Sequence, residues 1–247
     1  MPKGHPGAVG NSGPPAAAAQ HDPRSFDGLP RMFDRFAELV GGPLDDYLTE
    51  RLPPHGGRAV DLGCGTGRHA SLLATRFDEV LAVDVSAPML QHAQRRRAAA
   101  NIAYRQRGLL EVTPGQDGTF DFVLSTHTLH HLPHLPTALT QIRSLTRPGG
   151  QVVLVDNVDP RRQVPRRWFQ AEARKALLLD LRHHRRPIRE AVEVYRLSTH
   201  PGWLDHLASD RFLPAGELQQ AYGAVFPGAG FTPSYRTMAM HWRNPAR

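Results

Sequence analysis

A glycine-rich turn in the first third of the chain constrains the fold more than any other feature. An apolar run over residues 59–62, which contains Asp61, is followed at once by glycines at positions 63, 65 and 67. Glycine tolerates positive φ angles and lets a ligand approach the backbone closely. Residues 68–77 then carry apolar side chains at helical spacing. The pattern predicts a buried strand, a tight turn and a helix whose N-terminus faces an anionic ligand.

A second acid follows this turn at an informative distance. Residues 80–84 form another apolar run, which ends in Asp84 about 20 residues further on. A second parallel strand would place this carboxylate against a pair of ribose hydroxyls. The glycine order, Asp-x-Gly-x-Gly-x-Gly, differs from the nicotinamide pattern, and the Gly-Lys-Ser/Thr ending of a phosphate-binding loop is missing.

Strand and helix patterns alternate along the chain, which predicts an α/β fold with a doubly wound, mostly parallel seven-stranded sheet. The final segments, 231–235 and 236–243, predict an antiparallel C-terminal pair. Residues 157–214 interrupt the rhythm with two amphipathic segments, and we expect a helical cap insertion over the strand edge; an ordinary crossover helix with long loops is the alternative. Strands are expected at 58–62, 79–84, 102–106, 120–125 and 150–155, and helices at 32–40, 44–52, 68–77, 87–99, 135–145, 168–179, 188–197 and 213–226.

Four ordered motifs give the chain a family resemblance. The glycine turn, the strand at 120–125, the segment 129–132 (Leu-His-His-Leu) and the segment 145–154 resemble class I S-adenosylmethionine-dependent methyltransferases over residues 58–156. The resemblance implies a Rossmann-like fold and the cofactor S-adenosyl-L-methionine. The cofactor-binding residues it implies are Asp61, Gly63, Gly65, Asp84, Val85, Met89, Leu109 and Ser125.

The resemblance also assigns roles to some of these residues. Asp61 would lie near the ammonium group of the cofactor, and Asp84 would bind both ribose hydroxyls; capping a helix is the structural alternative for each acid. Met89 would pack on the adenine or simply fill the core. Leu109 stands where the family often has an Asp that binds the adenine amino group, so the adenine contact departs from the family pattern.

Histidines gather after the predicted fourth strand, at positions 127, 130, 131 and 134. Histidine is the side chain best suited to act as a base near neutral pH. His131 and His127 are therefore the predicted catalytic residues, although in many relatives the histidine at the position of His131 only packs. No metal site is predicted, because the cluster has no Cys or Glu partner and because Asp156-Asn157 lacks the second acid of a magnesium set.

Composition narrows the class of protein further. Residues 1–25 are predicted to form a disordered tail and residues 26–247 the methyltransferase domain. No apolar run approaches the length of a membrane span, and the single Cys64 excludes an intrachain disulfide, so we expect a cytoplasmic protein with no membrane association. The net charge of +7 is concentrated in arginines between residues 161 and 189, which suit a solvated helix face, an acidic ligand or RNA.

The predicted function is methyl transfer to oxygen or nitrogen of a small molecule, for example in secondary metabolism, and we expect no nucleic-acid partner. The alternatives are an RNA or protein methyltransferase and a cofactor-binding protein of the same fold that transfers no methyl group. No Asn-Pro-Pro-Tyr or Asp-Pro-Pro-Tyr segment follows the fourth strand, which argues against amino groups of adenine or glutamine as targets.

Overall fold

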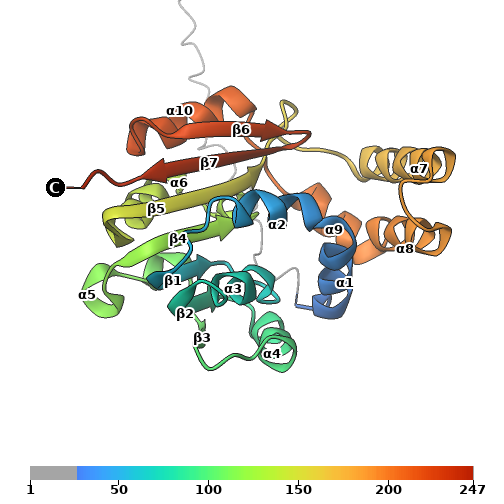
Figure 1. Cartoon of the computed structure of the whole chain (residues 1–247). Coiled ribbons are helices and arrows are strands. Elements are labelled where there is room, and N and C mark those ends of the chain that lie inside the picture. The colour runs from blue at the N-terminus through green and yellow to red at the C-terminus, as the bar shows by residue number, and fades with distance from the viewer. Residues whose placement is uncertain (1–26, 247) are drawn as a thin grey trace, which may run out of the picture.

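The computed structural model of the chain describes residues 27–246 and is built around a seven-stranded sheet (Figure 1). The strand order is β3-β2-β1-β4-β5-β7-β6. Strands β1 to β5 are parallel, and only β7 runs against its neighbours β5 and β6. The predicted fold class is confirmed. The strands are β1 (Gly56–Leu62), β2 (Phe77–Asp84), β3 (Ile102–Gln106), β4 (Phe120–Thr126), β5 (Thr146–Asn157), β6 (Gly230–Ser234) and β7 (Thr237–Arg243).

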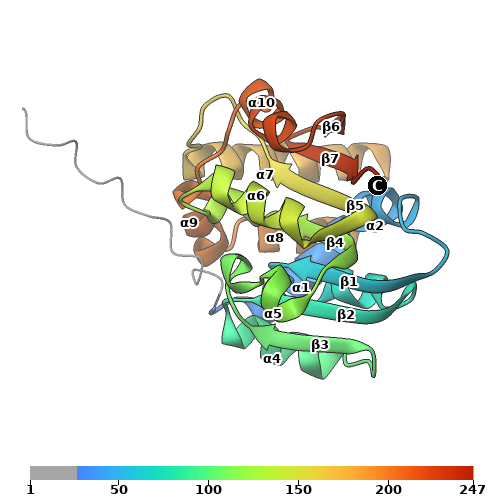
Figure 2. The same ribbon diagram turned by 90° about the vertical axis from the view of Figure 1, so that its left-hand side faces the viewer.

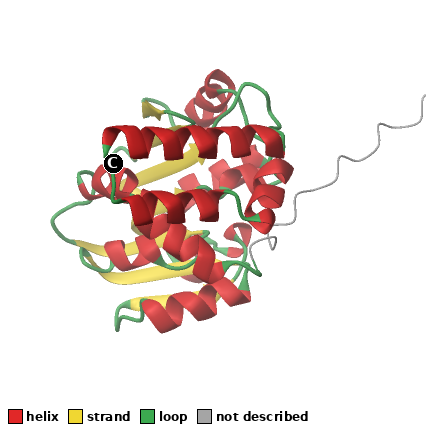
Figure 3. Ribbon diagram, turned by 90° about the vertical axis from the view of Figure 1, so that its right-hand side faces the viewer, coloured by secondary structure: helices red, strands yellow, loops and turns green. Residues whose placement is uncertain are grey.

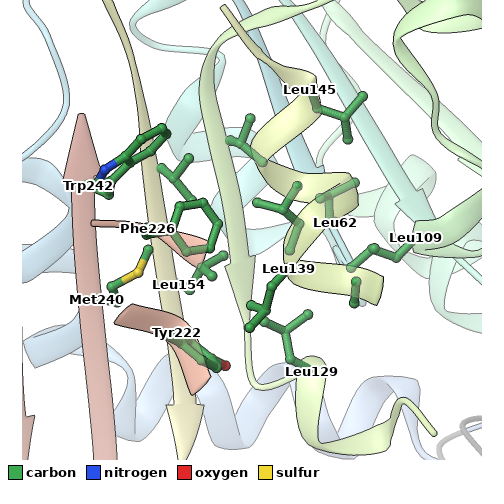
Figure 4. Close-up of a cluster of buried hydrophobic side chains, with 14 of the residues drawn as sticks. Leu62, Leu109, Leu129, Leu139, Leu145, Leu154, Tyr222, Phe226, Met240 and Trp242 are labelled. Carbon is green, nitrogen blue, oxygen red and sulfur yellow. The ribbon is translucent and has the colours of Figure 1, made fainter. Parts of the chain in front are cut away.

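Helices cover both faces of the sheet, as the alternating pattern predicts (Figure 2). One face packs against α2, α3 and α4, and the other against α6 and α10. Figure 4 shows the second of these layers, in which Leu62 of β1, Leu139 of α6 and Tyr222 of α10 are buried together. The helices are α1 (Pro30–Val40), α2 (Gly42–Thr49), α3 (Arg68–Leu73), α4 (Ala87–Arg96), α5 (Pro114–Asp117), α6 (Leu135–Leu145), α7 (Arg166–His183), α8 (Ile188–Ser198), α9 (Pro201–Ser209) and α10 (Ala215–Val225).

One predicted helix is too long. The helix expected over residues 68–77 ends at Leu73, and Phe77 begins strand β2 instead. Phe77 pairs with Gly56 in the sheet, and its ring lies 5.7 Å from that of Phe122. The apolar side chain that seemed to continue the helix therefore belongs to the core of the sheet, because tertiary packing outweighs local periodicity.

The insertion at residues 157–214 contains α7, α8 and α9, the last of which the sequence pattern does not predict. These helices lie beyond the carboxyl ends of the parallel strands, and α7 and α8 stand in front of those ends when viewed along the sheet (Figures 1 and 3). Trp203 of α9 joins the cap to α1, with ring distances of 5.9 Å to Phe33 and 5.5 Å to Phe36. The cap and α1 thus frame the edge where ligands of open α/β sheets bind. The tail predicted at residues 1–25 lies outside the described residues.

Candidate functional site: a nucleoside-binding edge and a buried acid–histidine cluster

The glycine turn has the backbone conformation that its sequence predicts. Gly63, Gly65 and Gly67 have φ angles of 82°, 50° and 78°, in the left-handed region. A Cβ atom on Gly63 would lie 2.3 Å from Oγ1 of Thr128, so this position also needs a bare backbone to pack against the loop after β4. The turn between β1 and α3 therefore leaves its backbone close to the carboxyl ends of both strands.

Asp84, at the end of β2, is tied to the glycine turn. Its Oδ2 accepts a hydrogen bond from the backbone N–H of Gly65 (2.8 Å), and its Oδ1 accepts one from Ser86 N–H (2.9 Å). Burial raises the pKa of this carboxyl group, although these N–H groups oppose the change. Ser86, not Asp84, caps α4 by accepting from Met89 N–H (3.3 Å). Each Asp84 oxygen keeps a lone pair that suits a ribose hydroxyl.

Asp61 is a deeply buried carboxyl group of this edge. It lies in β1, is 1 % exposed, and among the described residues neither carboxylate oxygen accepts a hydrogen bond of normal geometry. The backbone N–H of Ala70 and the ring of His69 lie near enough to oppose a higher pKa, but burial dominates and raises the pKa of Asp61 to about 6. A buried carboxylate of this kind fits a cationic ligand group such as an ammonium.

The adenine end of the predicted site is apolar. Met89 and Leu109 are 3 % and 6 % exposed, and Leu109 lies in a short 3₁₀ turn (Leu109–Glu111). Val85 packs against Gly108, which precedes this turn. The nearby acid, Glu111, accepts a hydrogen bond from Gly108 N–H (3.1 Å) and so holds the turn. Leu109 therefore cannot replace the hydrogen bond that an Asp at this position would make to the adenine amino group.

Ser125 has a structural hydrogen bond in addition to its predicted place in the site. Its buried hydroxyl donates to the carbonyl oxygen of Leu62 (2.8 Å). This bond joins β4 to the end of β1 at the start of the glycine turn. Ser125 thus fixes the two strands that carry the site.

The two predicted catalytic histidines have different immediate surroundings. His127 follows β4 with a φ angle of 53°, and its backbone N–H donates to Val155 O (2.7 Å). Burial lowers the pKa of His127 to about 4, although the charge of Asp156 opposes this, so its imidazole is neutral at physiological pH. The side chain of His131 lies instead in a buried cluster, with its Nδ1 atom 3.7 Å from Oδ1 of Asp210.

This acid–histidine cluster joins two neighbouring histidines of the sequence, His130 and His131, to three residues that are distant along the chain: Asp156, His206 and Asp210. His130 Nδ1 contacts Oδ1 of Asp156, and His130 Nε2 lies 3.6 Å from Oδ2 of Asp210. Burial opposes a charge on His130, but the two carboxylates outweigh it and raise the pKa of His130 to about 10. No sequence signal points to Asp210, because it follows a helix that the pattern does not predict and lies far along the chain from β4 and β5.

The order of the strands, the glycine turn and the acid at the end of β2 together define a Rossmann-like domain that binds a nucleoside-containing cofactor. Comparison with known proteins supports this assignment. A methyltransferase domain family matches residues 60–154. Over these residues the chain is a class I S-adenosylmethionine-dependent methyltransferase domain, and the predicted family and cofactor are confirmed.

Individual relatives cover different shares of the chain. An uncharacterized methyltransferase of Mycobacterium bovis is 39 % identical over 116 residues, which are 47 % of this chain and 58 % of the relative. A malonyl-[acyl-carrier protein] O-methyltransferase of Halorhodospira halophila is 31 % identical over 217 residues, 86 % of this chain and 65 % of the relative. The chain therefore spans less than two thirds of the length of either relative.

Solved structures share the fold. The DhpI–SAH complex superposes with a TM-score of 0.57 at 23 % identity and covers 93 % of this chain and 100 % of that one. Across residues 27–246, no helix combines the length and apolar character needed to cross a bilayer.

Proposed function

We propose that this chain transfers a methyl group from S-adenosylmethionine to an oxygen or nitrogen atom of a small molecule. The observation that carries the proposal is the pair of strand-end acids beside the glycine turn. Asp61 offers a buried carboxylate to an ammonium, and Asp84 offers two oxygens, already fixed by backbone N–H groups, to a ribose diol. These two carboxylates thus match the ammonium group and the ribose hydroxyls of this cofactor.

The chain's residues would mainly bind and orient the reactants. When bound, S-adenosylmethionine supplies an electrophilic methyl carbon, whose bond to sulfur breaks as its bond to the acceptor forms, with the electron pair left on sulfur. Asp61, Asp84 and the glycine turn would hold the amino-acid and ribose parts in line with the acceptor. The cap helices would exclude water from this edge, since Trp203 and α1 join them to the rest of the domain.

His127 is our candidate for the general base, which takes a proton from the small molecule that receives the methyl group. It is placed at the carboxyl end of β4, and its low pKa keeps it uncharged, so a ring nitrogen can accept a hydrogen bond. A base with this pKa is weak, and its proton would pass on to water after transfer. The predicted alternative, His131, belongs to the acid–histidine cluster.

Two curated relatives favour an oxygen acceptor. They are the malonyl-[acyl-carrier protein] O-methyltransferase and a ubiquinone biosynthesis O-methyltransferase of Xanthomonas axonopodis, which is 29 % identical over 111 residues, 44 % of this chain and 46 % of that relative. Both names describe transfer to oxygen. A hydroxyl or carboxylate on a small molecule, or on a molecule held by a carrier, is therefore the acceptor class that we favour.

The test uses S-adenosylmethionine labelled in its methyl group. Wild-type protein and Asp84→Ala are incubated with a metabolite extract, and products are separated into small molecules, RNA and protein. We expect a labelled small molecule only with the wild type, and loss of the label on mild alkaline hydrolysis would identify a methyl ester. Label in RNA or protein would refute the small-molecule acceptor, and cofactor binding without any labelled product would indicate a non-methyltransferase.

A further inference from the structure

The acid–histidine cluster lies at the same sheet edge as the proposed cofactor site but contains none of the residues proposed to bind the cofactor. His130 and His131 belong to the short 3₁₀ turn after β4, which begins next to Thr128, whose hydroxyl donates to Gly63 O (3.5 Å). Asp210 comes from the end of cap helix α9. The side chains of His130, His131 and Asp210 are 5 %, 9 % and 1 % exposed. The fold thus brings two imidazoles and a carboxylate together where the cap meets the sheet.

The spacing of these groups is compatible with a shared metal ion. One atom from each of His130, His131 and Asp210 lies within 4.8 Å of the others. Asp210 Oδ2 is 3.6 Å from His130 Nε2, and Asp210 Oδ1 is 3.7 Å from His131 Nδ1. Two ligand atoms, each about 2.1 Å from a shared ion at an angle of about 120°, are about 3.6 Å apart.

Asp156 supplies the support that a histidine ligand requires. A ligating imidazole usually donates its other N–H to a carboxylate, which fixes the tautomer and the ring orientation. His130 Nδ1 contacts Asp156, and Asp156 Oδ1 also accepts from Asn157 N–H (2.9 Å), so Nε2 of His130 is directed at Asp210. The two carboxylates together balance the charge of a divalent ion.

We propose that His130, His131 and Asp210 bind a divalent transition-metal ion of the zinc type, with Asp156 as the carboxylate that orients His130. Two imidazoles and a carboxylate suit such an ion and leave a coordination position open. His206, whose Nε2 is 3.7 Å from Asp210 Oδ2, borders this position. The sequence predicts no metal here because the histidines have no Cys or Glu partner and Asp156-Asn157 lacks a second acid; the fold brings Asp210 to the histidines.

The ion would bind the methyl acceptor through oxygen, and this part rests on the proposed function. A metal-bound hydroxyl loses its proton more readily than a free one, so the ion would present an oxygen nucleophile to the methyl group. The site therefore selects acceptors with a hydroxyl or carboxylate oxygen over amines. It also assigns His131 to metal binding and leaves His127 as the candidate base.

The experiment measures metal binding directly. Untagged full-length protein is treated with a chelator, dialysed and titrated with cobalt(II), and then zinc is added in competition. We expect one cobalt ion per chain with the visible absorption of a four- or five-coordinate site, displaced by zinc. His131→Gln and Asp210→Asn should abolish this absorption, Asp156→Asn should weaken binding about 10- to 100-fold, and the exposed His134→Gln should not change it.

The outcomes separate this proposal from the function. If the wild-type protein gives only the spectrum of hydrated cobalt, or if Asp210→Asn binds cobalt as tightly, the metal site is refuted even when methyl transfer is found. The wild-type spectrum decides this without any variant, should a variant fail to fold. If cobalt binds as expected but no acceptor is methylated, the site stands and the proposed function fails. Calorimetry with S-adenosylmethionine should give the same affinity with and without zinc.

Discussion

Asp61→Asn should stabilise the unliganded protein and weaken its binding of S-adenosylmethionine. Burial raises the pKa of Asp61 from 3.8 to about 6, so ionising this carboxyl group costs the folded state free energy that the unfolded chain does not lose. At pH 7.5 the cost is roughly 3 kcal/mol, because each pKa unit corresponds to about 1.4 kcal/mol. Asparagine has nearly the same shape and no charge, and burial of its amide offsets part of the gain.

The pH dependence gives the sharper test. A raised acid pKa contributes stability that is present below pH 3.8 and is lost as the pH rises through about 6. The advantage of the Asn variant, measured by urea unfolding, should therefore shrink by roughly 1.4 kcal/mol between pH 7.5 and pH 5. Asp46→Asn, at an exposed acid of α2, is the control and should show no such dependence.

S-adenosylmethionine should make the parent protein more stable than Asp61→Asn, the reverse of the order without ligand. Saturating S-adenosylmethionine stabilises the parent more than the variant, because only the parent offers a carboxylate to the ammonium. An Asn variant that is less stable than the parent at pH 7.5 without ligand would refute the reasoning. So would an equal difference at both pH values, since the cost would then not arise from ionisation of Asp61.

Three further predictions concern the same edge of the sheet. Asp84→Ala should raise the dissociation constant for S-adenosylmethionine about 30- to 150-fold by calorimetry, because a charge-assisted contact to two hydroxyls is lost; an unchanged constant would remove Asp84 from the ribose site. His127→Asn, which tolerates the left-handed backbone, should lower turnover at saturating cofactor about 10²-fold, the low end for a positioned base because its pKa is low, whereas the exposed His134→Asn should not; equal rates would show that His127 is not the base. Gly67→Ala should lower the urea midpoint clearly, since its φ is 78° and its Cβ would meet a tyrosine hydroxyl at 2.6 Å, whereas Gly115→Ala has open space and should be neutral; similar midpoints would contradict this packing.

The sequence by itself determined the sheet and the proposed cofactor edge. Apolar runs, a glycine turn and strand-end acids are local patterns, and parallel strands bring their carboxyl ends together whatever lies between them. Residues 102–106 and 135–145 form the predicted strand and helix with unchanged bounds. Helix α9 escaped prediction because it follows α8 after only a short break, and the apparent helix end at Phe77 was wrong because that side chain packs in the sheet.

Only the tertiary structure decided which polar groups share a buried environment. The raised pKa of Asp61 and the lowered pKa of His127 arise from burial, which no spacing of residues reveals. Asp210 reaches His130 and His131 because the cap folds back over the strand ends, so a carboxylate from a distant helix completes a cluster that looks incomplete in sequence. Local patterns fix elements through neighbours in the chain, whereas the chemistry of a site depends on contacts and desolvation that the assembled fold alone creates.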